Sequence, residues 1–104
     1  MISAQNLEPV RSEYADDEDF AELLEMFTEE IPVRRQRLEE AFNTQNMEEL
    51  KTLSHQLKGA GGGYGFPDLS VIAARLEQAC KDNTPEELSK GYQELHSYLG
   101  RITP

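Results

Sequence analysis

The chain of 104 residues contains no tryptophan and one cysteine. Cys80 cannot form an internal disulfide, which fits a reducing compartment, and we interpret it as a core residue. No run approaches the roughly 18–20 apolar residues that a membrane span needs. The N-terminus lacks the basic and apolar regions of a secretory signal. We therefore expect a soluble, cytoplasmic protein.

Basic residues are also scarce, since 10 Lys and Arg against 20 Asp and Glu give a net charge of −10. This charge argues against nucleic acid or an anionic membrane as a partner. The imbalance is local: residues 1–31 hold ten acids and one base, and the rest of the chain is nearly balanced. We interpret the acidic segment as a solvated face that aids solubility.

The sequence lacks the alternation of a β-strand, and its apolar residues recur with the period of an α-helix. Four such stretches joined by short loops predict an all-α, antiparallel up-down four-helix bundle over residues 17–104. Its expected inner faces contain Phe20, Leu23, Leu24, Phe27, Ile31, Leu38, Ala41, Phe42, Leu50, Leu53, Leu57, Gly61, Tyr64, Leu69, Ile72, Ala73, Leu76, Ala79, Cys80, Leu88, Tyr92, Leu95, Leu99 and Ile102.

The first helix is expected to be long. Its apolar stripe keeps the same phase on both sides of Pro32, which favours one kinked helix over about residues 17–43. Two helices that meet at Pro32 are the alternative. The preceding residues, 1–16, are expected to form a short N-terminal arm or helix, with Leu7, Val10 and Tyr14 against the bundle.

Capping residues predict the other helix ends. Asn46 followed by Glu49 resembles a capping box at the start of the second helix. That helix should end at Gly65-Phe66, ahead of Pro67, which suits the first position of the third helix. Thr84-Pro85, followed by two glutamates, predicts the start of the fourth helix with Thr84 as its N-cap.

Five of the seven glycines lie between residues 59 and 65, within the second helix. A glycine in a helix costs roughly 0.5–1 kcal/mol relative to alanine. His55 should point about 160° away from the core stripe, and Gly59 and Gly62 follow on the same solvent face. Lys58 lies on the flank of this face. Bare backbone there indicates that another folded surface comes close to His55.

The other glycines are expected to have different roles. Gly61 faces the core and would let helices pack closely, and Gly65 would end the helix. Gly63 is expected to lie away from the site and has no evident role. Tyr64 and Phe66 are interpreted as a packing cap at the helix junction, and His96 as a structural or solvent-exposed residue.

An exposed imidazole, mostly neutral near pH 7, is a competent nucleophile, and a nearby lysine can attract a phosphoryl group. The sequence offers no glycine-rich nucleotide loop and no histidine or cysteine at metal-ligand spacing. It also shows no carboxylate beside His55 that would act as a general base. We expect a histidine that receives and gives up a group, in a chain that does not bind a donor nucleotide.

The stretch from His55 to Gly59 reads H-x-L-K-G, and small residues follow it. Gly65 comes ten residues after the histidine, and the pair Leu76-Glu77 lies on the next helix. This pattern, over roughly residues 17–102, resembles the histidine-containing phosphotransfer (HPt) domain family, whose fold is a four-helix bundle. The run Gly61-Gly62-Gly63 is richer in glycine than the family pattern, which predicts fraying at the end of this helix when no partner is bound.

The resemblance implies that His55 takes a phosphoryl group from an aspartyl phosphate on a receiver domain and passes it to another receiver's aspartate. Lys58 would stabilise the phosphohistidine, and Gly59 would leave room for the partner. Gly62, Gln56 and Lys51 are further candidates for docking residues.

The expected partners are response-regulator receivers and a hybrid histidine kinase. We expect a monomeric carrier rather than a self-sufficient enzyme, with no cofactor or metal of its own and Mg²⁺ on the receiver. The alternative is a non-catalytic helical interaction module that docks a partner on its glycine-rich face.

Overall fold

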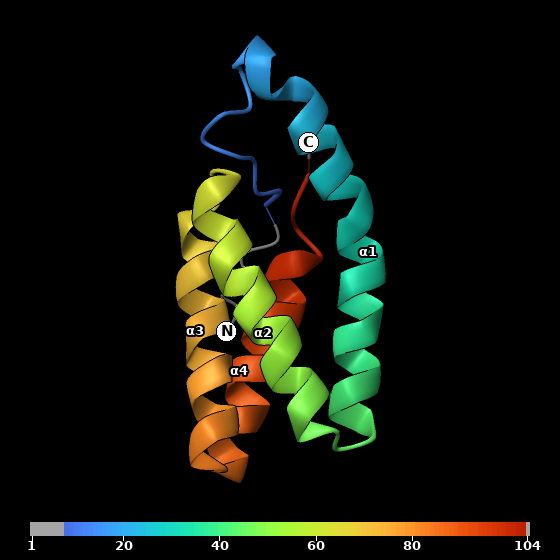
Figure 1. Cartoon of the computed structure of the whole chain (residues 1–104), viewed down its shortest axis with the longest axis vertical. Helices are drawn as coiled ribbons and strands as arrows, with labels where there is room; N and C mark the ends of the chain where they lie inside the picture. Colours follow the sequence, from blue (N-terminus) through green and yellow to red (C-terminus); the bar gives the residue numbers. More distant parts are fainter. Residues whose placement is uncertain (1–7, 104) are drawn as a thin grey trace.

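The computed structural model describes residues 8–103. A 3₁₀ turn, η1 (Glu18–Phe20), leads into four helices: α1 (Ala21–Asn43), α2 (Met47–Gly63), α3 (Pro67–Asp82) and α4 (Pro85–Leu99). The helices run alternately down and up the long axis, each beside the next along the chain (Figure 1). Because α4 also packs on α1, the ring of four is closed. The predicted all-α up-down bundle is confirmed.

One helix continues through Pro32, as expected, although it begins later than residue 17. The Asp17 side chain accepts a hydrogen bond from the Asp19 backbone N–H at 2.9 Å, and this local bond holds the chain in the 3₁₀ turn before α1. Pro32 lies on the exposed side of α1.

The core is made almost entirely of the predicted residues. Leu38, Leu50, Leu69 and Leu95 are fully buried, and Phe42, Tyr64, Ile72, Cys80 and Tyr92 pack against this core while half-buried. Leu23 is the exception because 47% of its surface is exposed. It lies at the edge of the α1 stripe, where no other helix covers it, and its assignment to the core was wrong.

One of the two predicted N-caps differs from expectation in detail. Asn46 accepts from the Glu49 N–H at 3.1 Å, as a capping residue should. Thr84 occupies the N-cap position of α4, but its side chain makes no capping hydrogen bond. Helix α4 ends at Leu99, so Ile102 packs from the segment beyond the helix and not from the helix itself.

The second helix ends at Gly63, two residues earlier than expected, in a Schellman motif. The Phe66 N–H donates to the Gly61 carbonyl at 2.7 Å, and the Gly65 N–H donates to the Gly62 carbonyl at 3.2 Å. Gly65 has φ +83°, a backbone conformation that favours glycine. The predicted role of Gly65 in ending the helix is confirmed.

An N-terminal arm, residues 8–17, crosses the end of the bundle where α2 meets α3 (Figure 1). Val10 pairs with the segment after α4, and its N–H donates to the Arg101 carbonyl at 2.7 Å. Ser12 Oγ donates to the Tyr64 carbonyl at 2.6 Å. Val10 packs on the core as predicted, Tyr14 stays 36% exposed, and Leu7 lies outside the described residues. The arm therefore ties the glycine-rich end of α2 to the bundle.

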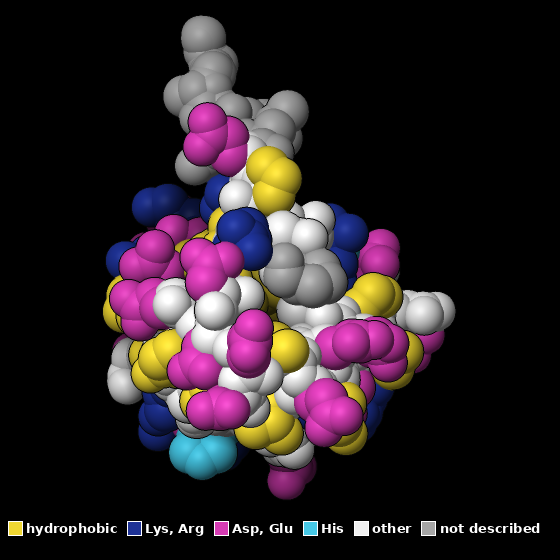
Figure 2. Space-filling view, turned by 90° about the horizontal axis from the view of Figure 1, so that it is seen from above, with side chains coloured by type: hydrophobic (Ala, Val, Ile, Leu, Met, Phe, Trp, Pro, Cys, Tyr) yellow, Lys and Arg dark blue, Asp and Glu magenta, His cyan; other side chains and the backbone are white. Residues whose placement is uncertain are grey.

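Acidic side chains gather on this end of the molecule, as the charge distribution predicted (Figure 2). The contributing residues include Asp16, Asp17, Glu18, Asp19 and Glu22, all exposed. None of the described helices combines the length and apolarity needed to cross a membrane.

Helices α2 and α3 approach closely at Gly61, and a matched pair of substitutions tests this. A Cβ on Gly61 would lie 2.7 Å from the Ser70 backbone N and 2.9 Å from the Phe66 carbonyl, whereas a Cβ on Gly59 would meet nothing within 4 Å. We expect Gly61→Ala to lower the free energy of unfolding by about 1–3 kcal/mol. Gly59→Ala should raise it by about 0.5–1 kcal/mol. Urea titration measures both, and equal effects would contradict the close approach.

Candidate phosphohistidine site

His55 lies midway along α2, with 67% of its side chain exposed. This part of the helix is anchored by three buried residues, Leu53, Ser54 and Leu57. The buried Ser54 hydroxyl donates to the Leu50 carbonyl at 2.7 Å. A histidine one residue after this buried face must point outward, as the helical period predicted. The imidazole is therefore both accessible and held on a rigid element.

A carboxylate contacts His55, contrary to the expectation from sequence. Glu77 of α3 places Oε2 2.8 Å from His55 Nδ1 and Oε1 2.7 Å from Lys58 Nζ. Only 8% of the Glu77 side chain is exposed, although its partners reach solvent. The pair Leu76-Glu77 was the one feature of the sequence that could have indicated this contact. Leu76 is fully buried, so the next residue lies at the edge of the α3 face that packs on α2.

The Lys58 ammonium, which donates a hydrogen bond to the carboxylate, holds the pKa of Glu77 below its ordinary value of 4.5. Burial acts in the opposite direction, and His55 and Lys81 add to the lowering. Glu77 is therefore ionised near neutral pH and can only accept hydrogen bonds. Its contact with Nδ1 places the proton on that nitrogen, and in the neutral imidazole the lone pair is then on Nε2.

The other predicted residues lie on both sides of His55. Gly59 and Gly62 are exposed on α2, and Gln56 lines a shallow depression of about 220 Å³ between α1 and α2. Lys51 lies on the opposite side, in a groove that also contains Cys80 and Lys81. The structure thus brings His55 and Lys58 together around Glu77 and sets Gln56 and Lys51 on either flank.

Gly61 is buried against α3, as expected from its phase. The Gly62 N–H donates to Ser70 Oγ at 2.9 Å, and this hydroxyl donates to the Lys58 carbonyl at 2.7 Å. The predicted packing cap is also present: the Tyr64 ring stacks on Phe27 with centroids 4.3 Å apart, and Phe66 is buried. Ser70, which had no signal in the sequence, therefore fastens the backbone of the site helix to α3.

His96 lies far along the chain from this site and has a structural setting. The Arg35 guanidinium donates to its backbone carbonyl at 2.9 Å, and its ring lies beside Tyr92 with centroids 5.3 Å apart. Burial lowers the pKa of His96, and the nearby Arg35 acts in the same direction. Its interpretation as a structural residue agrees with these contacts.

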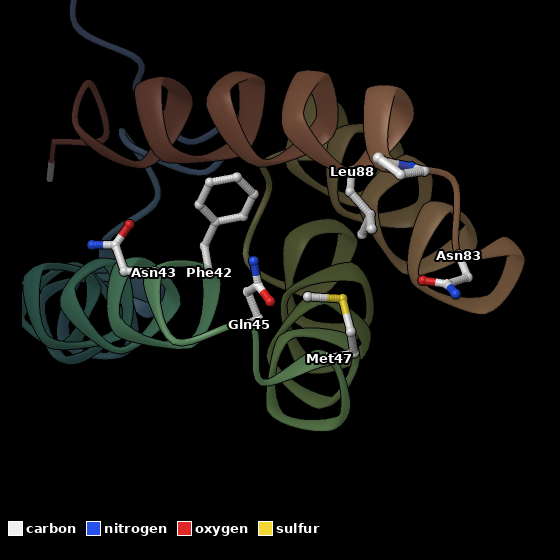
Figure 3. A pocket seen from close by; sticks show the side chains of 7 residues that line it. Phe42, Asn43, Gln45, Met47, Asn83 and Leu88 are labelled. Carbon is white, nitrogen blue, oxygen red and sulfur yellow. The ribbon is translucent and has the colours of Figure 1, made fainter.

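A hollow on the described surface lies away from the histidine site. It occupies about 540 Å³ between the α1–α2 and α3–α4 turns and is lined by Phe42, Asn43, Gln45, Met47, Asn83, Pro85 and Leu88 (Figure 3). None of the His55, Lys58 and Glu77 side chains lines it. Among residues 8–103 there is also no cluster of three or more side chains suited to hold a metal ion.

The sequence profile of the Hpt domain matches residues 22–103, most of the chain. No curated protein and no solved structure matches closely enough to add to this result. With the four-helix bundle and the exposed histidine, this match shows that the chain belongs to the Hpt domain family. Members of this family are phosphotransfer carriers in phosphorelay signalling, are not kinases, and interact with response-regulator receivers.

The ion pairs of Glu77 predict a pH-dependent stability. Because its pKa is lower in the folded chain, the unfolded chain binds more protons between the folded value and 4.5. This contribution is fully present above the unfolded pKa and is lost as the pH falls through the folded value. We expect Glu77→Gln to lower the unfolding free energy by about 1 kcal/mol at neutral pH, since its partners can be resolvated.

Urea titrations of wild type and Glu77→Gln over the acid range measure this difference, which should shrink as the pH falls through the folded pKa. The matched control is Glu29→Gln, an exposed glutamate on α1. A difference that stays constant with pH, or the same behaviour in the control, would contradict the assignment.

Proposed function

We propose that the chain is a phosphorelay intermediate in which His55 accepts a phosphoryl group from a receiver aspartyl phosphate and passes it to the aspartate of another receiver. The observation that carries this proposal is the hydrogen bond from the exposed His55 to Glu77 through Nδ1. It leaves Nε2 as the nucleophilic nitrogen. A surface histidine without a function would not need a nearly buried carboxylate to orient its ring.

In the proposed reaction, the Nε2 lone pair attacks phosphorus, and the bond from phosphorus to the acyl oxygen breaks. The electron pair leaves on the donor aspartate, and the proton stays on Nδ1, where it remains hydrogen-bonded to the Glu77 carboxylate. The positive charge that the ring gains is thus stabilised by the carboxylate. Transfer to the second receiver reverses these steps. We propose that Mg²⁺ and the remaining catalytic carboxylates belong to the receiver, and that this chain binds no cofactor.

Lys58 is proposed to stabilise the phosphohistidine. It precedes the exposed Gly59 and lies three residues after His55, so both side chains project from the same part of α2. With 38% of its side chain exposed, it has access to a group on the imidazole as well as to Glu77. As a point charge, an ammonium suits a phosphoryl group that must arrive and leave.

The proposed docking surface extends from His55 across Gly59, Gly62 and Gln56 to α1, with Lys51 on the other flank. Exposed apolar side chains continue it on α1, where Met26 is 64% and Val33 60% exposed and Leu23 is also exposed. Val33 and Gln56 line the same depression, which makes the surface continuous between α1 and α2. Gly63, which was expected to lie away from the site, is also exposed and open, and we propose that it admits the same partner.

We also place this relay in the cytoplasm, together with the response regulators that the family serves. The free Cys80 thiol, half-buried and unable to pair within the chain, supports a reducing compartment.

The first test is phosphotransfer itself. Wild type mixed with phosphorylated receiver and Mg²⁺ should acquire radioactive phosphate that is acid-labile and alkali-stable, and His55→Gln should acquire none. Label on His55→Gln would exclude the proposed acceptor. If the receiver binds but neither wild type nor His55→Gln acquires label, the result would instead support the non-catalytic interaction module.

The second test concerns the docking surface. We expect Met26→Glu and Val33→Glu each to weaken receiver binding about tenfold, because a charge would be buried against the partner. Val71→Glu is the matched control, since Val71 is 51% exposed and lies in the α3–α4 groove with Arg75, Glu94 and Tyr98. Calorimetric titration measures the affinities. If all three substitutions weaken receiver binding equally, or if none of them weakens it, α1 is not part of the proposed interface.

A further inference from the structure

The Glu77 carboxylate has a third neighbour, Lys81, in addition to the two partners that bind it closely. Its Oε1 is bound by Lys58, and its Oε2 faces both His55 Nδ1 at 2.8 Å and Lys81 Nζ at 3.8 Å. Lys81 lies on α3, one helical turn after Glu77, and 53% of its side chain is exposed. In the resting geometry, this longer contact adds little to a carboxylate that already has two close partners.

Phosphorylation of His55 would give Lys58 a second anionic group to bind. In the proposed function, Lys58 stabilises a phosphoryl group that carries close to two negative charges, and this group competes with Glu77 for the same ammonium. As Lys58 turns toward the phosphoryl group, the nearly buried carboxylate loses its shortest partner. A buried charge that loses its partner is costly. Another cation within reach of Glu77 would remove most of this cost.

We propose that Lys81 is a positioning residue for phosphotransfer, and that its ammonium takes over Glu77 while Lys58 binds the phosphoryl group. This inference rests on the proposed function of His55. Lys81 does not touch the phosphoryl group in this scheme. It keeps Glu77 ionised and in place, so that the carboxylate still faces Nδ1 when the bond between Nε2 and phosphorus forms.

The surroundings of Glu77 leave this role to Lys81. The ion pairs and electrostatic interactions of this carboxylate come from His55 and Lys58 on α2, and from Lys81 and Cys80 on α3. Cys80 cannot supply positive charge, and burial raises the pKa of its thiol. Once Lys58 is engaged with the phosphoryl group, Oε2 keeps its hydrogen bond to His55 Nδ1, and Lys81 is the lysine that remains beside it.

The test compares Lys81→Ala, Lys81→Arg and the control Lys90→Ala, an exposed lysine on α4. The rate of phosphoryl transfer to each variant is measured with a receiver domain charged by acetyl phosphate, in Mg²⁺, from about pH 5 to pH 8. We expect Lys81→Ala to slow transfer about threefold to tenfold. The loss should be greater at low pH, where Glu77 is more easily protonated. Lys81→Arg should restore most of the rate, and Lys90→Ala should resemble wild type.

Urea titration checks that each variant is folded. Lys81→Ala that matches Lys90→Ala in rate and pH profile would overturn the proposal. The proposal would also be overturned if Lys81→Ala slowed transfer without changing the pH profile and Lys81→Arg did not restore the rate. Lys81 would then act at the docking surface. Absence of label on wild type would overturn the proposed function itself, and this inference with it.

Discussion

The contact between Glu77 and the α2 side chains depends on how closely α3 packs against α2. Gly61 has no side chain to separate the two helices, and Ser70 fills the contact with hydrogen bonds to the α2 backbone on either side. About two turns further along α3, the Glu77 carboxylate meets Lys58 and His55. A wider separation would take the Glu77 carboxylate out of reach of both α2 side chains, so these two contacts depend on the close packing.

The helical period explains why the histidine is exposed while the carboxylate is not. His55 lies opposite the α2 core stripe, and Glu77 follows the fully buried Leu76 at the edge of α3. The hydrogen bond between His55 and Glu77 therefore spans from the solvent side of one helix to the covered side of its neighbour. Such an arrangement fixes the tautomer of the imidazole while it leaves the other ring nitrogen to a partner.

Much of this architecture follows from the sequence alone. The phase of the apolar residues across Pro32 predicted a single first helix, and the same period predicted that His55 and Gly59 share an exposed face. Both depend on residues close together in the chain. The contact between His55 and Glu77 does not, because it depends on the relative height and rotation of two packed helices, which the period of either helix does not specify.

Local patterns also failed where a tertiary contact or its absence decided the outcome. Leu23 fits the apolar stripe of α1, but no other helix covers it. Ile102 fits the stripe of α4, but the helix ends at Leu99, and the segment beyond it pairs with Val10 in the arm. Neither result could be read from periodicity, which reports the direction of a side chain and not what lies opposite it.

The exposure of the site has a consequence for the proposed relay. A carrier must release its phosphoryl group as readily as it accepts it, so strong stabilisation of the phosphohistidine would trap it. An ammonium near solvent interacts weakly because water screens its charge. The hydrogen bond from Nδ1 to the nearly buried Glu77 carboxylate involves the other ring nitrogen and serves attack and release equally. The strong electrostatic stabilisation of the transition state is then left to the receiver, and transfer becomes fast only when a receiver is docked.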